Sequence, residues 1–238
     1  MLRALGSPDI TVPNKSRTDL DSHADQCAVG RTSLIVHDYD RPTNVTGYNP
    51  TGPIAKDLRT VSAALAYDDP VTGETVILLV HQAIHIPDLE HNLLSTMQVH
   101  LIDVLVSNTP RFLTGNVTDL THTLAIPTSD VSKPYVIPLS LNGVASTFPT
   151  RKPTKEEYES LPHLSLTSDD LDYDPHDPSF AAQEDALTKY LLETVDRIGA
   201  PPPSRCLCSV SKMFSFGLDF AYDGPAISLQ QTTTTLDD

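Results

Sequence analysis

One long apolar run limits the fold of this chain more than any other feature. Residues 75–86 have the sequence TVILLVHQAIHI, and the first half of this run is apolar on both alternating faces. A strand with this pattern is covered on both sides and lies at the centre of a sheet. The preceding residues 68–73, DDPVTG, supply Asp, Pro and Gly in the order that a hairpin loop requires. The run therefore predicts a central strand that follows a hairpin turn.

The first 145 residues have the pattern of an all-β domain. Short apolar runs alternate with turn residues, and no helical periodicity is long enough to predict a helix. We predict strands at residues 10–12, 27–29, 33–36, 44–48, 59–67, 75–86, 101–106 and 135–141. The predicted organisation is an N-terminal extension over residues 1–14 and a mainly β domain over residues 15–145.

The composition changes in the remaining part, residues 146–238. Between residues 155 and 197 there are twelve acidic and three basic residues. This excess of charge predicts a solvated acidic spacer. The spacer begins with a capping box, Thr154 followed by Glu157, which predicts a short helix over residues 155–160.

A longer helix is predicted over residues 178–198. Asp177 can cap it, and Pro178 occupies the first helical position, where a missing N–H is tolerated. Apolar residues recur on one face and stop before Gly199; they are Leu187, Leu191, Val195 and Ile198. The tail that follows has no clear period.

The balance of charge and apolar residues argues against several classes of function. Acidic residues outnumber basic ones by 31 to 16, and a formal net charge of −15 disfavours a surface that tracks nucleic-acid phosphates. No apolar run is long enough to span a membrane, and residues 1–10 lack the apolar stretch of a secretory signal. The sequence predicts a soluble intracellular protein that binds neither nucleic acid nor a membrane.

The cysteines and histidines do not form a recognisable metal motif. Cys27, Cys206 and Cys208 are too few for a disulfide framework or a four-ligand zinc site, so we expect reduced thiols. The densest histidines are His81, His85 and His91. His81 and His85 would share a face of a strand, but no third ligand is in register with them. We expect structural polar residues here, with no metal and no cofactor.

Two motifs carry the chemistry. Residues 21–25, Asp-Ser-His-Ala-Asp, follow an extended segment and precede an apolar strand, and they resemble the D-[S/T]-G-A signature of aspartic proteases. Residues 83–95, AIHIPDLEHNLLS, resemble the hydrophobic element that threads behind the catalytic loop in retroviral-type proteases. In the copia class this element is an apolar strand, a proline and Asn-Leu-Leu-Ser. About seventy residues separate the two motifs, which is enough for a flap and a central hairpin.

The chain thus resembles the protease segment of the Pol polyprotein of copia-type retrotransposons, of the kind found in diatoms and other microbial eukaryotes. Further similarity lies in LDSHAD (residues 20–25), HDYDRPTNVTGY (37–48), VSAALAYD (61–68) and FPTRKPT (148–154). The resemblance covers roughly residues 15–185. It implies that the β domain is a retropepsin-like closed barrel, followed by the acidic linker with one α-helix.

The same resemblance implies roles for the motif residues. The catalytic loop comprises Asp21, Ser22, His23 and Ala24. Residues 44–53 are the candidate flap, with Val45, Thr46, Gly47 and Tyr48 facing the substrate. Asn92, Leu93, Leu94 and Ser95 are the structural support of the catalytic loop.

One chain carries one such aspartate motif, whereas this chemistry uses two carboxylates that share a proton. An active enzyme would therefore be a homodimer in which Asp21 of each subunit meets on a two-fold axis, with Ser22 locking the two loops together. The expected geometry is a loop backed by Asn92–Ser95 that leaves the carboxylate open to the partner. A buried Asp21 bound by a base of its own chain would contradict it.

Two residues depart from the wider family pattern. His23 stands where most retropepsins have Gly, and Ser95 replaces the Gly of the second element, as copia-type chains also do. Our hypothesis is that a protonated His23 favours the ionised form of Asp21.

The implied function is cleavage of a Gag–Pol-like polyprotein substrate, in the cytoplasm or within retroelement virus-like particles. The alternative is a catalytically inactive or truncated Pol fragment that acts as a structural or interaction segment. In that case residues 155–198 would be an inter-domain spacer. Both alternatives keep the β core, so the fold alone does not separate them.

Overall fold

The computed structural model describes residues 15–46, 52, 54–130, 133–170 and 172–198. The chain divides into two compact units, the first ending at Pro175 and the second beginning at His176. Several predicted features lie outside the described residues. They are the extension 1–14 with its strand 10–12, the flap residues Gly47 and Tyr48, and the cysteines Cys206 and Cys208.

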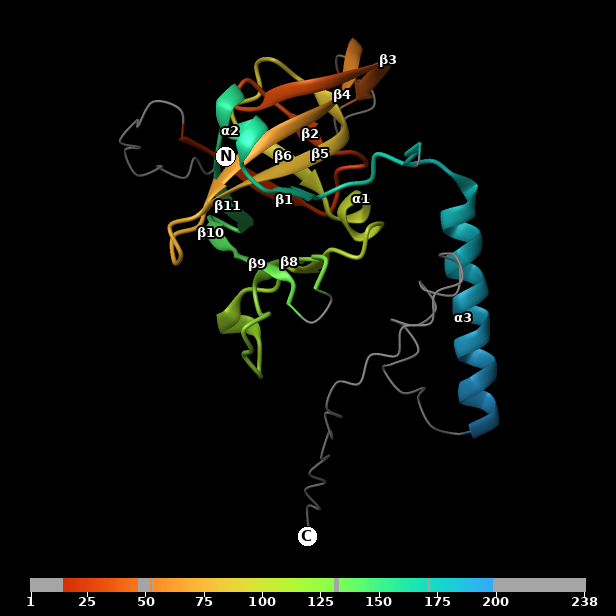
Figure 1. Cartoon of the computed structure of the whole chain (residues 1–238). Coiled ribbons are helices and arrows are strands. Elements are labelled where there is room, and N and C mark those ends of the chain that lie inside the picture. The colour runs from red at the N-terminus through yellow and green to blue at the C-terminus, as the bar shows by residue number, and fades with distance from the viewer. Residues whose placement is uncertain (1–14, 47–51, 53, 131–132, 171, 199–238) are drawn as a thin grey trace. The chain divides into compact units, whose positions relative to one another are not determined.

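Strands dominate the first unit, as Figure 1 shows. The described strands are β1 (Lys15–Asp21), β2 (Ala28–Val29), β3 (Leu34–Thr46), β4 (Ile54–Asp68), β5 (Thr75–His85), β6 (Asn92–Ser95), β7 (Leu105–Ser107), β8 (Thr123–Ile126), β9 (Tyr135–Pro138), β10 (Ser140–Asn142), β11 (Ala145–Arg151) and β12 (His163–Ser165). The helices of this unit are α1 (Thr96–His100), α2 (Lys155–Ser160) and the 3₁₀ turn η1 (Arg111–Leu113). The predicted mainly β class is confirmed.

Nine strands form one sheet in the order β10-β11-β1-β6-β2-β5-β4-β3, with β12 beside β5. The other three form a smaller sheet, β7-β8-β9, which lies below β10 and β11 in Figure 1. The large sheet runs from an edge at β10 to an edge at β3, and β11 meets β4 at one residue pair, Arg151 with Ala66. The predicted closed barrel is therefore wrong: the sheet is open, because a single pair does not join two strands along their length.

The apolar run of residues 75–86 is the central strand that its sequence predicts. β5 pairs with β4 on one side and with β2 and β12 on the other. Val76, Leu78 and Val80 face the main core, which also contains Tyr67 and Phe148 with their rings edge to face. Ile77 faces a second, smaller apolar cluster on the opposite side. Both faces of β5 are thus covered.

The β domain extends further than the predicted boundary after residue 145. β11 pairs antiparallel with β1 from Lys15 with Arg151 to Asp19 with Thr147, and β12 pairs parallel with β5. Pro149 lies within β11 but beyond the last pair with β10, where the edge of β11 is not covered by β10 and a missing N–H is tolerated.

Helix boundaries follow their caps. α2 begins at the predicted capping box, since the Thr154 side chain accepts from the Glu157 N–H and the Glu157 side chain accepts from the Thr154 N–H. The second unit contains α3 (Pro178–Ile198), the range predicted, and Asp177 accepts a hydrogen bond from the Ser179 N–H at its start.

The strand predicted at residues 101–106 is shorter, because residues 101–103 form the turn that ends α1 and the strand begins at Leu105. No described helix has the length and apolarity needed to cross a bilayer.

A bulge in β5 changes which side chains share a face. Val61 pairs with Ala83 but Ala63 pairs with Val80, so β5 has one extra residue between these pairs. Gln82 lies in the bulge with a φ of 53°, a left-handed conformation that is uncommon outside glycine. The extra residue shifts the alternation, so that His81 and His85 lie on opposite faces. The expectation that they share a face is therefore wrong.

Gly30 follows β2 at a point of close backbone approach. A Cβ atom built at this position would lie 2.0 Å from the carbonyl oxygen of Leu89. Leu89 is held in place by its own N–H, which donates to the Ile86 oxygen. The turn after β2 therefore has no room for a side chain at residue 30.

We expect Gly30→Ala to lower the free energy of unfolding by about 3 kcal/mol, because a backbone atom must move to admit the methyl group. Gly115→Ala is the matched control, since open space surrounds that position, and it should stay within about 0.5 kcal/mol. Urea unfolding followed by circular dichroism measures both. Equal stability of the two variants would contradict the close approach.

His122 lies directly before β8 of the smaller sheet and is buried, with 4% of its surface exposed. Its Nε2 lies 3.1 Å from Ser146 Oγ, and burial, together with Arg111, lowers its pKa from the usual 6.5. Burial likewise lowers the pKa of His81. A folded state that disfavours protonation binds fewer protons than the unfolded chain.

These histidines therefore contribute stability that is complete above about pH 6.5 and is lost as the pH falls through their lower folded pKa values. We expect the urea concentration at the midpoint of unfolding to decrease when the pH is lowered from 8 to 5.5. His122→Asn, which keeps a residue that tolerates the local φ of 59°, should make this fall smaller. A pH dependence identical to that of the native chain would exclude His122 as a contributor.

Candidate active site

Asp21 lies at the last position of β1, where the strand runs into an exposed loop. β1 is parallel to β6, and their register places Asp21 opposite Ser95. β6 also pairs antiparallel with β2 through Leu93 and Ala28. The chain therefore leaves β1, passes over the end of β6 in residues 22–27, and returns as β2 on its other side. The two sequence motifs meet at this point.

The far end of the loop is fixed from the interior by Cys27, which is fully buried. Its N–H donates to Gln98 Oε1 at 2.9 Å, and its carbonyl accepts from the Ile84 N–H at 2.8 Å. The Ser95 N–H donates to its sulfur at 3.3 Å. Burial raises the pKa of Cys27 to about 12, so this thiol is a packing group and not a nucleophile.

The second motif supports the loop through its side chains as well as its backbone. Asn92 is fully buried, and its Oδ1 accepts from the Gly30 N–H at 3.0 Å. Leu94 packs in the main core, and Leu93 pairs with both neighbouring strands. The hydroxyl of Ser95 caps α1 by accepting from the Gln98 N–H. A serine at this position thus begins the helix that carries Gln98.

The carboxylate of Asp21 is accessible, with 41% of its side chain exposed. Its Oδ1 accepts from the His23 N–H at 2.9 Å. Among the described residues, the one basic side chain recorded within 4.0 Å is His23, whose Nδ1 lies at that distance and whose side chain is 94% exposed. Ser22 is exposed, and its hydroxyl lies 3.2 Å from His23 Nδ1. Ala24 is half-buried in the same loop.

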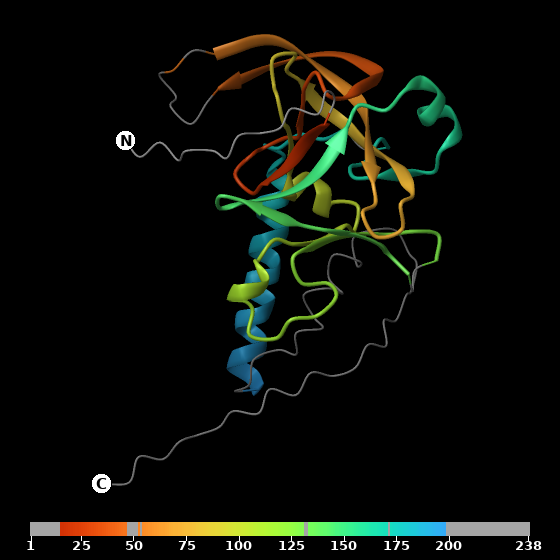
Figure 2. The same cartoon turned by 90° about the vertical axis from the view of Figure 1, so that its left-hand side faces the viewer.

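The candidate flap belongs to the long hairpin of β3 and β4, whose two arms run along the top of the unit in Figure 2. Val45 pairs with Ala55 and Thr46 with Ile54, so both residues lie near the end of the hairpin. Register shifts interrupt β3 on either side of Pro42 and Thr43. Bulges of this kind bend a strand and increase its twist.

A buried polar network that the sequence motifs do not reveal joins this site to the rest of the unit. Its centre is Gln82, which is 1% exposed. The carbonyl of Gln82 accepts from Gln26 Nε2 and from Gln98 Nε2, and its Oε1 accepts from Arg41 Nη2 and from the Tyr173 N–H. Single glutamines carry no sequence signal, since their role depends on a bulge and on a segment ninety residues away.

His81, His85 and His91 have separate environments. His81 Nδ1 lies 2.9 Å from Ser62 Oγ, and His85 Nδ1 lies 3.0 Å from Arg59 Nη2. His91 Nδ1 is buried and has no hydrogen-bond partner in the described part of the chain. The described residues contain no group of three or more His, Cys, Asp or Glu side chains that could hold a metal ion.

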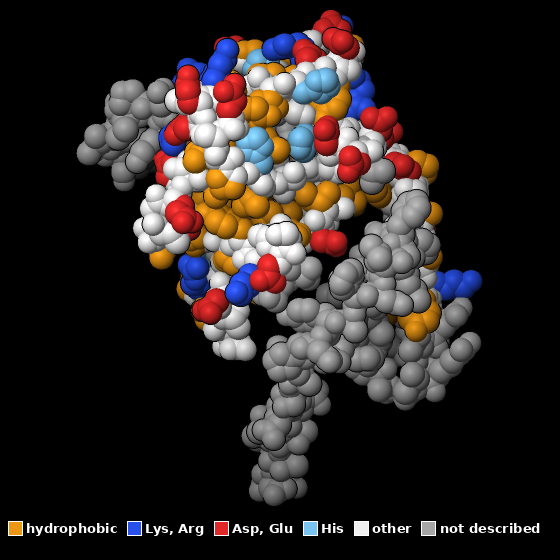
Figure 3. All heavy atoms as spheres, in the orientation of Figure 1, with side chains coloured by type: hydrophobic (Ala, Val, Ile, Leu, Met, Phe, Trp, Pro, Cys, Tyr) orange, Lys and Arg blue, Asp and Glu red, His pale blue; other side chains and the backbone are white. Residues whose placement is uncertain are grey.

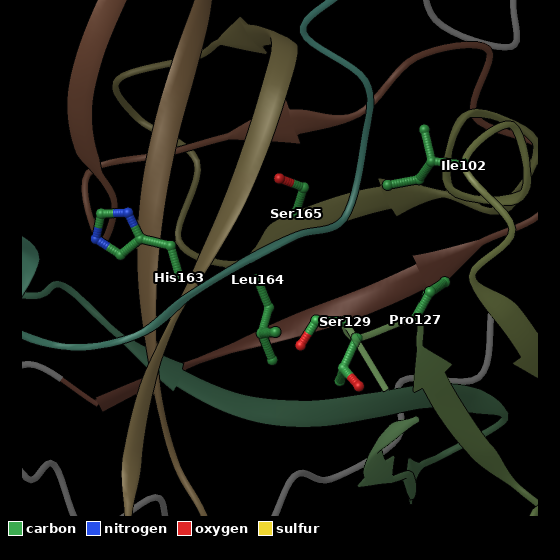
Figure 4. A pocket seen from close by; sticks show the side chains of 7 residues that line it. Ile102, Pro127, Ser129, His163, Leu164 and Ser165 are labelled. Atoms are coloured by element: carbon green, nitrogen blue, oxygen red, sulfur yellow. The ribbon is translucent and has the colours of Figure 1, made fainter. Parts of the chain in front are cut away.

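A pocket of about 460 Å³ lies elsewhere, between β12 and the segment that follows β8 (Figure 4). Its lining residues are Ile102, Pro127, Thr128, Ser129, His163, Leu164 and Ser165. None of these belongs to the Asp21 loop, the hairpin or the second motif. On the face in Figure 3, acidic and basic side chains are interspersed, so that this face presents no continuous basic surface for nucleic acid.

No protein-family model, curated protein or solved structure matches this chain.

Proposed function

We propose that this chain is a homodimeric aspartic endopeptidase of the retropepsin-like kind. The observation that carries the proposal is the position of Asp21, an accessible carboxylate in a loop that passes over β6 beside Ser95. Two motifs that are seventy residues apart in the sequence meet there, as the resemblance requires. A carboxylate in an ordinary turn would not be expected to lie beside the second motif.

The chemistry needs two such carboxylates sharing one proton, because like charges about 3 Å apart do not both ionise. The ionised carboxylate takes a proton from a water, whose oxygen bonds to the carbonyl carbon of the substrate. The protonated carboxyl gives its proton to the carbonyl oxygen. In the collapse of this diol intermediate, one of its hydroxyls returns a proton to the carboxylate that gave one, the other carboxyl passes the proton from water to the nitrogen, and the C–N bond breaks. One copy of the chain contributes Asp21, and the second copy contributes its counterpart.

The exposure of the loop supports a two-fold contact at this point. Ser22 and His23 are exposed in the single chain, although Leu20, two residues before Ser22, is buried. A second copy of the same loop would cover them, with the Ser22 hydroxyl bonding across the axis. The hairpin of β3 and β4 would close over a bound polypeptide and exclude water.

The resemblance extends the proposal to its biological role, the processing of a Gag–Pol-like polyprotein in the cytoplasm or in virus-like particles. The competing proposal is a Pol fragment that keeps the β core without activity. The exposed ring of His23 beside Asp21, where most retropepsins have glycine, is the observation that favours it. Cleavage assays separate the two.

We expect the full chain to cleave an unstructured polypeptide and Asp21→Asn to lose at least about 100-fold in rate, because the amide can neither share a proton nor accept one from water. Asp119→Asn, the same change in an exposed turn, is the matched control and should cleave normally. Mass spectrometry of the fragments between pH 4 and pH 7 measures all three. Absence of cleavage by the native chain across this range would favour the inactive fragment.

Mixing subunits tests whether the site is shared. With a tenfold excess of Asp21→Asn subunits, random pairing leaves about a tenth of the native subunits in native pairs. Activity per native subunit should fall to about that fraction, whereas an excess of Asp119→Asn subunits should leave it unchanged or raise it. Activity that ignores the excess of Asp21→Asn would mean that each chain works alone.

A further inference from the structure

The acidic segment after β12, which the sequence predicts to be a solvated spacer, is bonded to the domain along much of its length. We use the word strap for residues 166–170, 172 and 173. Leu166 is fully buried in the main core, and its N–H donates to the Leu79 oxygen at 2.8 Å. The hydroxyl of Thr167 accepts from the His81 N–H at 2.6 Å and donates to the His81 oxygen at 2.8 Å. The strap thus continues the pairing of β12 along the edge of β5.

The strap next reaches the arm of the candidate flap. The Tyr39 hydroxyl, on β3, donates to Asp169, whose carboxylate also lies 3.5 Å from His81 Nδ1. Arg41, also on β3, lies 3.5 Å from the carboxylate of Asp172. Asp169 and Asp172 of the strap therefore face a hydroxyl group and a basic group of the hairpin arm.

The strap ends at the Asp21 loop. Tyr173 donates its N–H to Gln82 Oε1 at 2.8 Å and its hydroxyl to the carbonyl oxygen of Asp25 at 2.6 Å. Tyr173 therefore bonds directly to the first motif of the candidate site, at the residue four positions after Asp21.

These contacts differ from a chance surface association in their burial. Leu166 and Thr167 of the strap are buried, and so is Gln82 of β5, which accepts from the Tyr173 N–H. Gln82 Oε1 accepts hydrogen bonds from both Arg41 Nη2 and the Tyr173 N–H. One buried amide thus joins the hairpin arm, β5 and the strap, and a fully satisfied network of this kind makes its members rigid.

We propose that the strap is a working part of the candidate active site and that Tyr173 is a positioning residue, which holds the loop of Asp21 against β6 and β5. This inference rests on the proposed function for its catalytic consequence. The loop is exposed on its outer side, so its geometry is determined by what holds it from within. Small errors in the position of a reacting group reduce rates steeply. The strap would also couple the hairpin arm, through Tyr39 and Arg41, to the position of the loop.

The test compares Tyr173→Phe with Tyr158→Phe in the full chain. Both remove one tyrosine hydroxyl and keep the ring, and Tyr158 lies on α2, away from the loop. Hydrogen exchange is followed at the amides of His23 and Cys27, which donate to Asp21 Oδ1 and Gln98 Oε1. We expect about tenfold faster exchange of these amides in Tyr173→Phe and no change in Tyr158→Phe.

In the cleavage assay, Tyr173→Phe should lower kcat by about tenfold with little change in KM, since a displaced loop affects the reaction more than the binding of the polypeptide. Exchange at the native rate in Tyr173→Phe would overturn the proposal, and so would faster exchange with an unchanged kcat. If the native chain does not cleave polypeptides, the proposed function fails, and the exchange comparison still decides whether Tyr173 holds the loop.

Discussion

The parallel pairing of β1 with β6 is the constraint on which the rest of the site depends. Parallel neighbours cannot be joined by a tight turn, and in this chain β2, the hairpin of β3 and β4, and β5 lie between β1 and β6. β6 then enters between β1 and β2 and fixes the loop that joins them. The position of Asp21 follows from this insertion, since its partner across the ladder is Ser95.

Close packing around the insertion leaves little freedom at a few positions. Gly30 has no room for a Cβ, because the Leu89 carbonyl lies there, and the Asn92 side chain accepts from the Gly30 N–H. Cys27 occupies a fully buried position where its sulfur accepts from the backbone of Ser95. A loop that is exposed outside and fixed inside can present a carboxylate without becoming mobile itself.

The acidic excess of the chain acquires a different meaning once its partners are known. The carboxylates of Asp169 and Asp172 lie against Tyr39, His81 and Arg41, so part of the predicted spacer is a component of the domain. Charge runs are usually solvated, and the sequence offered no sign of these partners because they lie more than eighty residues away. The compact unit consequently ends at Pro175 and not at residue 145.

The sequence by itself determined the local features. The apolar alternation of residues 75–86, the capping box at Thr154 and the start of α3 at Pro178 are encoded within a few residues, because strand burial and helix caps depend on near neighbours. The motifs at Asp21 and Asn92 were also visible. Only the tertiary structure decided that the large sheet is open, that the bulge at Gln82 separates His81 from His85, and that Tyr173 reaches the Asp21 loop. These features depend on strand register and on contacts between distant segments, and residue spacing along the chain contains neither.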